Sequence, residues 1–132
     1  MSNFHALPDI LSALATIPVE SGAAGTVKVL ADGERLGAVI LKFEGADVRM
    51  HRQPEHEELL IVLEGEASFR VAEEIRQVRR GDFIFVPRGA MHGTLSIDAA
   101  PLSMLSIMAP KLFDPTKDVV WEKGAAPRYQ LA

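Results

Sequence analysis

"GADVRMHRQPEHEELLIVLEG", residues 45–65, is the stretch that decides the fold, because a cluster of metal-binding and acid–base side chains meets an apolar run there. In an extended chain, residues two positions apart lie on one face, so His51 and Gln53 point the same way. By the same rule, Glu58 shares a face with every second apolar residue of the run that follows it. A carboxylate among apolar side chains is costly unless it is paired, hydrogen-bonded or bound to a cation.

A second cluster lies in "GDFIFVPRGAMHGTLS", residues 81–96. Its apolar run predicts a strand that ends at Pro87, and "PRG" predicts a tight turn in which Gly89 adopts a positive φ. His92 then opens the next strand. In a small antiparallel barrel such strand starts converge inside, where two imidazoles, an amide oxygen and a carboxylate would suit a divalent first-row metal.

Most of the chain consists of short apolar or β-branched runs separated by turn residues. They begin with "TVKVLA" at residue 26, include "LGAVILKF", "DVRMH", "ELLIVLE", "EASFRV", "IRQV" and "GTLSI", and end with "LSMLSIM" at residue 108. We interpret "EG" at 64–65 and "DAAP" at 98–101 as breaks between separate strands. Many short strands at close spacing predict an all-β sandwich or barrel.

The run "ELLIVLE" differs from a strand with one solvated face, because both of its faces are apolar. We therefore expect one face of this strand to contact the barrel interior. We expect the other face to be covered by another sheet, by a helix or by a second subunit. We also expect a homodimer that buries an apolar sheet face.

Both ends of the chain depart from the strand pattern. Residues 9–16 predict a short helix, because apolar residues recur at helical spacing and Pro8 and Asp9 suit its start. The tail from Ala109 onward predicts loops, and its apolar residues are expected to pack back on the body: Phe113, Val119, Val120 and Trp121. A chain of 132 residues with 48% hydrophobic residues fits a single domain, residues 1–132.

Composition and charge narrow the function classes. The chain has no cysteine, which excludes disulfides, thiolate metal sites and a cysteine nucleophile. The formal net charge is −4 and the one basic cluster, at Arg76, Arg79 and Arg80, is short and flanked by acids, so we expect no nucleic-acid partner. Because no apolar run approaches the roughly 20 residues of a membrane span, we expect a cytoplasmic protein with no membrane partner.

Taken together, the two clusters resemble the paired motifs of the cupin superfamily, as found in its small single-domain members. The first motif has the family's spacing at Gly45, His51, Glu58 and Gly65, and Gln53 stands where the second histidine belongs. The second motif matches at Gly81, Pro87, Gly89 and His92, and Ser96 replaces its terminal asparagine. Two separate spacings that agree in order make the resemblance specific.

The resemblance implies a double-stranded β-helix, or jelly-roll barrel, over about residues 26–108, with the helix and the tail packed on it. It also implies one divalent transition metal, from among Fe, Mn, Ni, Cu and Zn, held by His51, Glu58 and His92. Gln53 would occupy the remaining ligand position. An amide oxygen is a weaker ligand for these metals than an imidazole, so Gln53 would bind weakly, bind through a water, or hold substrate instead.

Several residues admit a second interpretation. Glu57 competes with Glu58 for the inward position, and His56 is expected at the surface, with a minor alternative in which it replaces the missing ligand. The methionines in or next to the predicted strands are expected to fill the core, namely Met50, Met91, Met104 and Met108. The strand phenylalanines are expected in the core or in a dimer interface, namely Phe69, Phe83 and Phe85.

The expected function is that of a small metal-binding cupin that acts on a small organic molecule. The resemblance favours dioxygenase chemistry, followed by isomerase and lyase chemistry. The alternative is a cupin that binds or senses a small ligand without catalysis. A purely structural or storage role is the weakest hypothesis, because the motif residues are retained.

Overall fold

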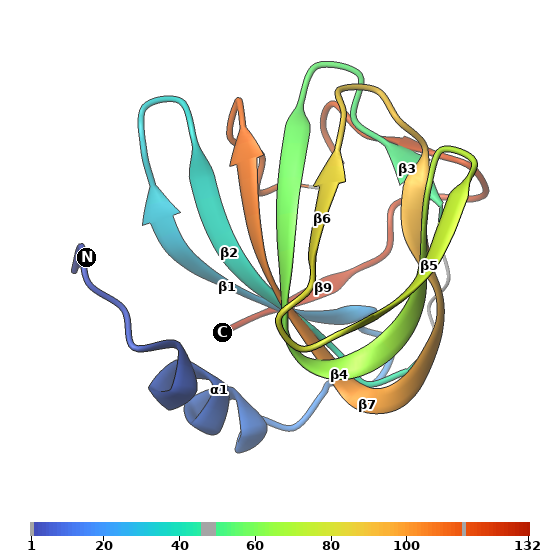
Figure 1. Ribbon diagram of the computed structural model, residues 1–132. Helices are drawn as coiled ribbons and strands as arrows, with labels where there is room; N and C mark the ends of the chain where they lie inside the picture. Colours follow the sequence, from blue (N-terminus) through green and yellow to red (C-terminus); the bar gives the residue numbers. More distant parts are fainter. Residues whose placement is uncertain (1, 46–49, 115) are drawn as a thin grey trace.

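Two long strands, β4 (Glu57–Val71) and β7 (His92–Ala109), run side by side through a sharp bend and form much of the barrel (Figure 1). They pair antiparallel along nearly their whole length, and the register shifts at the bend. Gly65 lies in the bend with φ +88, a conformation that favours glycine. The predicted breaks at "EG" and "DAAP" are therefore wrong, because both segments continue as bent strands.

The computed structural model describes residues 2–45, 50–114 and 116–132. Besides the two long strands, this part of the chain contains helix α1 (Leu7–Ala15) and strands β1 (Gly25–Asp32), β2 (Gly37–Phe43), β3 (His51–Arg52), β5 (Glu74–Arg79), β6 (Phe83–Val86), β8 (Val120–Trp121) and β9 (Tyr129–Leu131). The main sheet path is β5-β4-β7-β2-β1-β9, with β6 on β4 and β3 between β7 and β8. The predicted all-β class with a short N-terminal helix is confirmed. Most of the predicted strand "DVRMH" lies outside the described residues.

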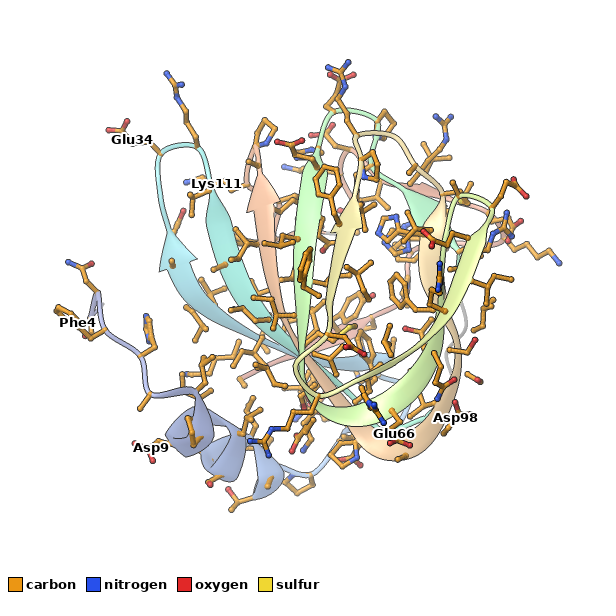
Figure 2. All side chains as sticks on the ribbon, viewed as in Figure 1. Phe4, Asp9, Glu34, Glu66, Asp98 and Lys111 are labelled. Carbon is orange, nitrogen blue, oxygen red and sulfur yellow. The ribbon has the colours of Figure 1, made fainter. Side chains whose placement is uncertain are left out.

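The barrel core follows from the alternation of side chains along the strands. In the first half of β4, Glu58, Leu60 and Val62 point inward, and Glu57 is exposed. The core cluster also contains Phe69. Of the methionines, Met50, Met104 and Met108 are buried and Met91 is half-buried. The bend itself is polar at the surface, where Glu66 and Asp98 lie (Figure 2).

Helix α1 covers part of the outer sheet face next to β1 and β2 (Figure 1). Its Leu14 packs with Leu30 and Ile40, and the half-buried residues around this cluster include Leu63 and Leu105. The buried Lys42 donates a hydrogen bond from Nζ to the carbonyl oxygen of Leu14, at 2.9 Å, and so satisfies a carbonyl at the end of the helix. Part of the outer face of β4 is thus covered by the helix.

The helix begins two residues earlier than predicted and ends one residue earlier. Pro8 lies within its first turn rather than before it, a position where the missing N–H carries no penalty. Upstream of the helix, Phe4 projects from the N-terminal segment apart from the barrel (Figure 2). No helix in the described ranges has the length and apolar character needed to cross a lipid bilayer.

The C-terminal tail is more ordered than a loop. Strand β8 pairs with β3, and β9 adds to β1 in parallel. Phe113, Val119 and Trp121 are half-buried, as expected, but Val120 is exposed, because alternation along β8 turns it outward. The prediction that Phe83 and Phe85 lie in the core is also wrong, since their side chains are 70% and 52% exposed. Their place in a dimer interface stays a prediction.

Candidate metal centre

Three strands and one turn bring the four candidate ligands to one cavity of about 140 Å³. His51 is in β3 directly opposite His92, the first residue of β7. Glu58 enters from β4, and Gln53 comes from the turn between β3 and β4. That turn is tied to the predicted "PRG" turn, because the N–H of Gly89 donates to the carbonyl oxygen of Gln53 at 3.0 Å. Gly89 has the expected positive φ, +79.

Glu58 and His92 form a close buried pair. Nε2 of His92 lies 3.2 Å from Oε1 of Glu58, and the residues are 1% and 6% exposed, respectively. The other carboxylate oxygen, Oε2, accepts a hydrogen bond from the hydroxyl of Ser106 at 2.5 Å. Nδ1 of His92 lies 2.9 Å from the carbonyl oxygen of Ala90, which fixes the orientation of the ring.

The electrostatics favour the ionised carboxylate. Burial is the largest single influence and by itself raises the pKa of Glu58, but close contact with a protonated His92 and the charge of that ring lower it. The Ser106 hydroxyl and the charge of His51 add to that lowering, so the pKa of Glu58 lies below its ordinary value of 4.5. The carboxylate is therefore charged at neutral pH, which is the form that binds a cation.

The pair needs a positive charge between its two facing atoms. A carbonyl oxygen only accepts, so Nδ1 of His92 carries a proton and Nε2 of the neutral ring is an acceptor. Nε2 is buried and makes no hydrogen bond of acceptable geometry with any group in the described ranges. A proton or a metal ion would compensate the two acceptors, so the residues fit a metal by their chemistry.

The other two candidate ligands lie at the same cavity but are held differently. The ring of His51 lies between that of His92, at a centroid distance of 4.3 Å, and that of Trp121, at 4.7 Å, and is tilted against both. Gln53 is buried, as a cavity-lining residue should be. Within residues 2–45, 50–114 and 116–132, no group of three or more His, Cys, Asp or Glu is arranged as a formed metal centre.

His56 is buried, not at the surface as predicted, with 5% of the residue exposed. Its Nδ1 lies 2.6 Å from the carbonyl oxygen of Pro110, and its Nε2 lies 3.6 Å from Oδ2 of Asp118. Both ring nitrogens thus face the C-terminal segment, and His56 is not among the residues that line the cavity. The ring ties the turn before β4 to the chain beyond β7.

Replacing His56 by alanine is expected to lower the free energy of unfolding by about 1–3 kcal/mol, because the Pro110 carbonyl loses its partner and the buried ring leaves a gap. Urea denaturation followed by circular dichroism measures the change. His5→Ala serves as the control, since His5 lies in the exposed N-terminal segment. Equal stability of both variants would show that the His56 contact contributes nothing.

Sequence reasoning missed part of the cavity wall. Ser106 shares the inward face of β7 with Met104 and Met108, so the two-residue period was the signal that would have found it. A further group of missed residues comes from the C-terminal segment and follows no motif: Leu112, Phe113, Val119, Trp121, Pro127 and Tyr129.

A family model agrees with the motif assignment. Residues 39–108, just over half of the chain, match the model described as the Cupin domain. No curated protein matches the chain. The first motif and the second motif both fall inside the matched residues.

Solved structures agree on the fold. A protein with a double-stranded β-helix domain from Klebsiella pneumoniae is 16% identical, with 94% of this chain and all of that chain covered and a TM-score of 0.70. KdgF from a Halomonas species is 26% identical, with 73% and 86% covered and a TM-score of 0.61. The DMSP lyase DddQ from Ruegeria pomeroyi is 27% identical, with 67% and 43% covered and a TM-score of 0.55. The predicted double-stranded β-helix is therefore confirmed.

Proposed function

The chain belongs to the cupin family, and from that premise we propose that it is a metal-dependent enzyme that acts on a small organic molecule inside its barrel. The observation that carries the proposal is the buried pair of Glu58 and His92. Its two facing acceptor atoms are 3.2 Å apart, and they line a cavity large enough for a small molecule. A cation at this position would remove the repulsion between them.

The metal would be one divalent ion, from among Fe, Mn, Ni, Cu and Zn. His51, Glu58 and His92 would hold it, and Gln53 would offer a neutral amide oxygen. When bound, such an ion supplies Lewis-acid chemistry, and a redox-active one also passes electrons between a substrate and dioxygen.

The chain's own residues prepare this site. Ala90 accepts from Nδ1 of His92 and so leaves Nε2 as the ligand atom, and Ser106 holds one oxygen of Glu58. The apolar wall behind Glu58, formed by Leu60 and Phe69, excludes water and strengthens every electrostatic interaction in the cavity.

Two reaction classes are supported to different degrees. The family resemblance favours dioxygenase chemistry. Lyase chemistry is the second class, supported by the 27% identity to the DMSP lyase DddQ. The two differ in one measurable respect, because only the dioxygenase consumes oxygen.

The test uses the full chain loaded separately with Fe²⁺, Mn²⁺, Ni²⁺, Cu²⁺ and Zn²⁺. Oxygen consumption and product formation are followed with a panel of small diketones, phenolic acids and β-substituted acids. Substrate-dependent oxygen uptake is expected with iron or copper. Product without oxygen uptake would assign a lyase or isomerase, and a fully metallated protein with no turnover would count against an enzyme.

A non-catalytic binding protein is the second candidate. It is favoured by Gln53 at a position where the family motif has histidine, and by the described residues forming no ready cluster of three metal ligands. Tight binding of a small ligand without any turnover would identify this role.

We also propose that two copies associate through an outer patch formed by five residues: Leu59, Ile61, Phe83, Phe85 and Ile107. Phe85, Leu59 and Ile107 lie in one row across three strands. Phe83 and Ile61 form the next row. Both phenylalanines are more than half exposed, and helix α1 packs elsewhere, on the cluster around Ile40.

Replacing both Phe83 and Phe85 by glutamate is expected to convert a dimer into a monomer, because two charges would be buried in an apolar contact. Light scattering coupled to size-exclusion chromatography at micromolar concentration measures the mass. Leu36→Glu is the control, an exposed apolar residue in the hairpin before β2. A parent protein that is already monomeric would reject the dimer.

A further inference from the structure

The cavity has two chemically distinct parts. The polar groups contact one another: Ser106 donates a hydrogen bond to Glu58, Glu58 faces His92, and the ring of His92 contacts that of His51. The rest of the lining is mainly aliphatic and aromatic, and it includes Val39, Leu41, Phe43, Leu60 and Met104. A ligand that fills the cavity therefore has a polar group at one end and an apolar body.

The C-terminal segment supplies a large part of the apolar wall, with residues that lie beyond the matched family model. Leu112, Phe113, Val119, Trp121, Pro127 and Tyr129 all line the cavity. Trp121 covers the ring of His51 at 4.7 Å, and Tyr129 meets Phe43 edge-on at 6.4 Å. This wall therefore lies outside the barrel residues that match the family model.

Backbone hydrogen bonds hold the wall in place on both sides. The N–H of Glu122 donates to the carbonyl oxygen of Met50 at 2.9 Å, next to β8. The N–H of Ala24 donates to the carbonyl oxygen of Arg128 at 2.8 Å, next to β9. The apolar surface is thus part of the folded barrel, and a ligand meets it in a preformed arrangement.

The volume matches a ligand of about one ring. A dry apolar cavity of roughly 150 Å³ accommodates benzene, and this cavity measures about 140 Å³. A hydroxyl placed against the apolar wall would lose its water without gaining a partner, which weakens binding. A ring that carries many hydroxyls is therefore disfavoured, and a ring with a single oxygen at the polar end is favoured.

We propose that the ligand is a compact molecule with an apolar body about the size of one six-membered ring and one oxygen-bearing group. The body lies against the C-terminal wall, and the oxygen faces Glu58 and His92. The inference rests on the proposed function, because it assigns the substrate class of the same site. It makes the C-terminal segment the part of the chain that determines specificity.

Cyclohexanol and myo-inositol test the proposal, since they share a six-membered ring and differ in having one or six hydroxyls. Calorimetry and the fluorescence of Trp121, the single tryptophan, measure binding to the metal-free and the metal-loaded full chain. Cyclohexanol is expected to bind at least about 100 times more tightly than inositol, because each unpaired hydroxyl weakens binding. Equal binding of the two, or failure of cyclohexanol to bind, would overturn the proposal.

Two variants test the role of the wall. Val119→Asp places a charge in the wall and is expected to weaken cyclohexanol binding at least about tenfold. Ile75→Ala, an exposed position on β5, should leave it unchanged. If Val119→Asp fails to fold, Phe113→Ala replaces it, and this larger cavity should admit 1-adamantanol, which the parent excludes. Adamantanol binding by the parent would contradict the size limit.

Metal content measured on the same samples separates the proposed ligand class from the proposed metal-dependent function. Bound metal without cyclohexanol binding would reject the ligand class and leave the proposed function standing. Cyclohexanol binding without any bound metal, even after reconstitution, would reject the proposed function and leave the ligand class standing.

Discussion

The His92→Ala variant is expected to retain less than a tenth of the metal that the parent protein holds, with affinity reduced at least about 100-fold. Loss of a hydrogen-bond partner of a metal ligand alone weakens affinity by about 10–100-fold, so loss of the ligand itself has a larger effect. The substitution also leaves Glu58 buried without its close partner at 3.2 Å. Elemental analysis and competition with a chromophoric chelator measure content and affinity.

His56→Ala is the matched control, since it removes another buried imidazole that does not line the cavity. It should keep the parent's metal content at a temperature where both variants are folded. A third variant, Gln53→His, adds a ligand instead of removing one. It should raise the affinity for the metal at least about tenfold, because an imidazole binds these metals more strongly than an amide oxygen. Unchanged metal content across all three variants would place the metal elsewhere or remove it from the hypothesis.

Gly65→Ala is expected to destabilise the protein by at least about 4 kcal/mol and to prevent normal folding at 37 °C. Gly65 has φ +88, where a side chain costs about 1–3 kcal/mol. A Cβ there would also overlap the carbonyl oxygen of Pro101 and lie 2.7 Å from that of Ala99, both on the neighbouring strand. The bend of β4 and β7 would have to open to admit it.

The Gly81→Ala variant separates the cost of the positive φ from the cost of the steric overlap. Gly81 has a similar φ, +92, but a Cβ there would meet no atom within 4 Å. The variant should therefore lose only the conformational part, about 1–3 kcal/mol. Chemical denaturation and the yield of folded protein measure both variants. Similar losses for the two glycines would show that the close approach at the bend contributes nothing.

Much of the barrel and of the candidate site followed from local pattern. The motif spacing to Gly65 favoured Glu58 over Glu57 for the inward position, and the structure buries Glu58 and exposes Glu57. The second motif put His92 at the start of a strand, and the structure pairs it directly opposite His51. These features were predictable because they depend on neighbours within a few residues, where strand geometry leaves two faces and little choice.

Contacts between distant segments decided the rest. The bond of His56 to the Pro110 carbonyl spans 54 residues, so no local signal could move that histidine from the surface into the interior. "EG" and "DAAP" look like turns locally, but pairing of β4 with β7 carries both strands through the bend. The sequence by itself determined the β character of residues 26–108 and favoured Glu58 for the inward position at the start of β4. Only the tertiary structure decided that the C-terminal segment walls the cavity, because its aromatic residues have no period and are positioned by pairing with β1 and β3.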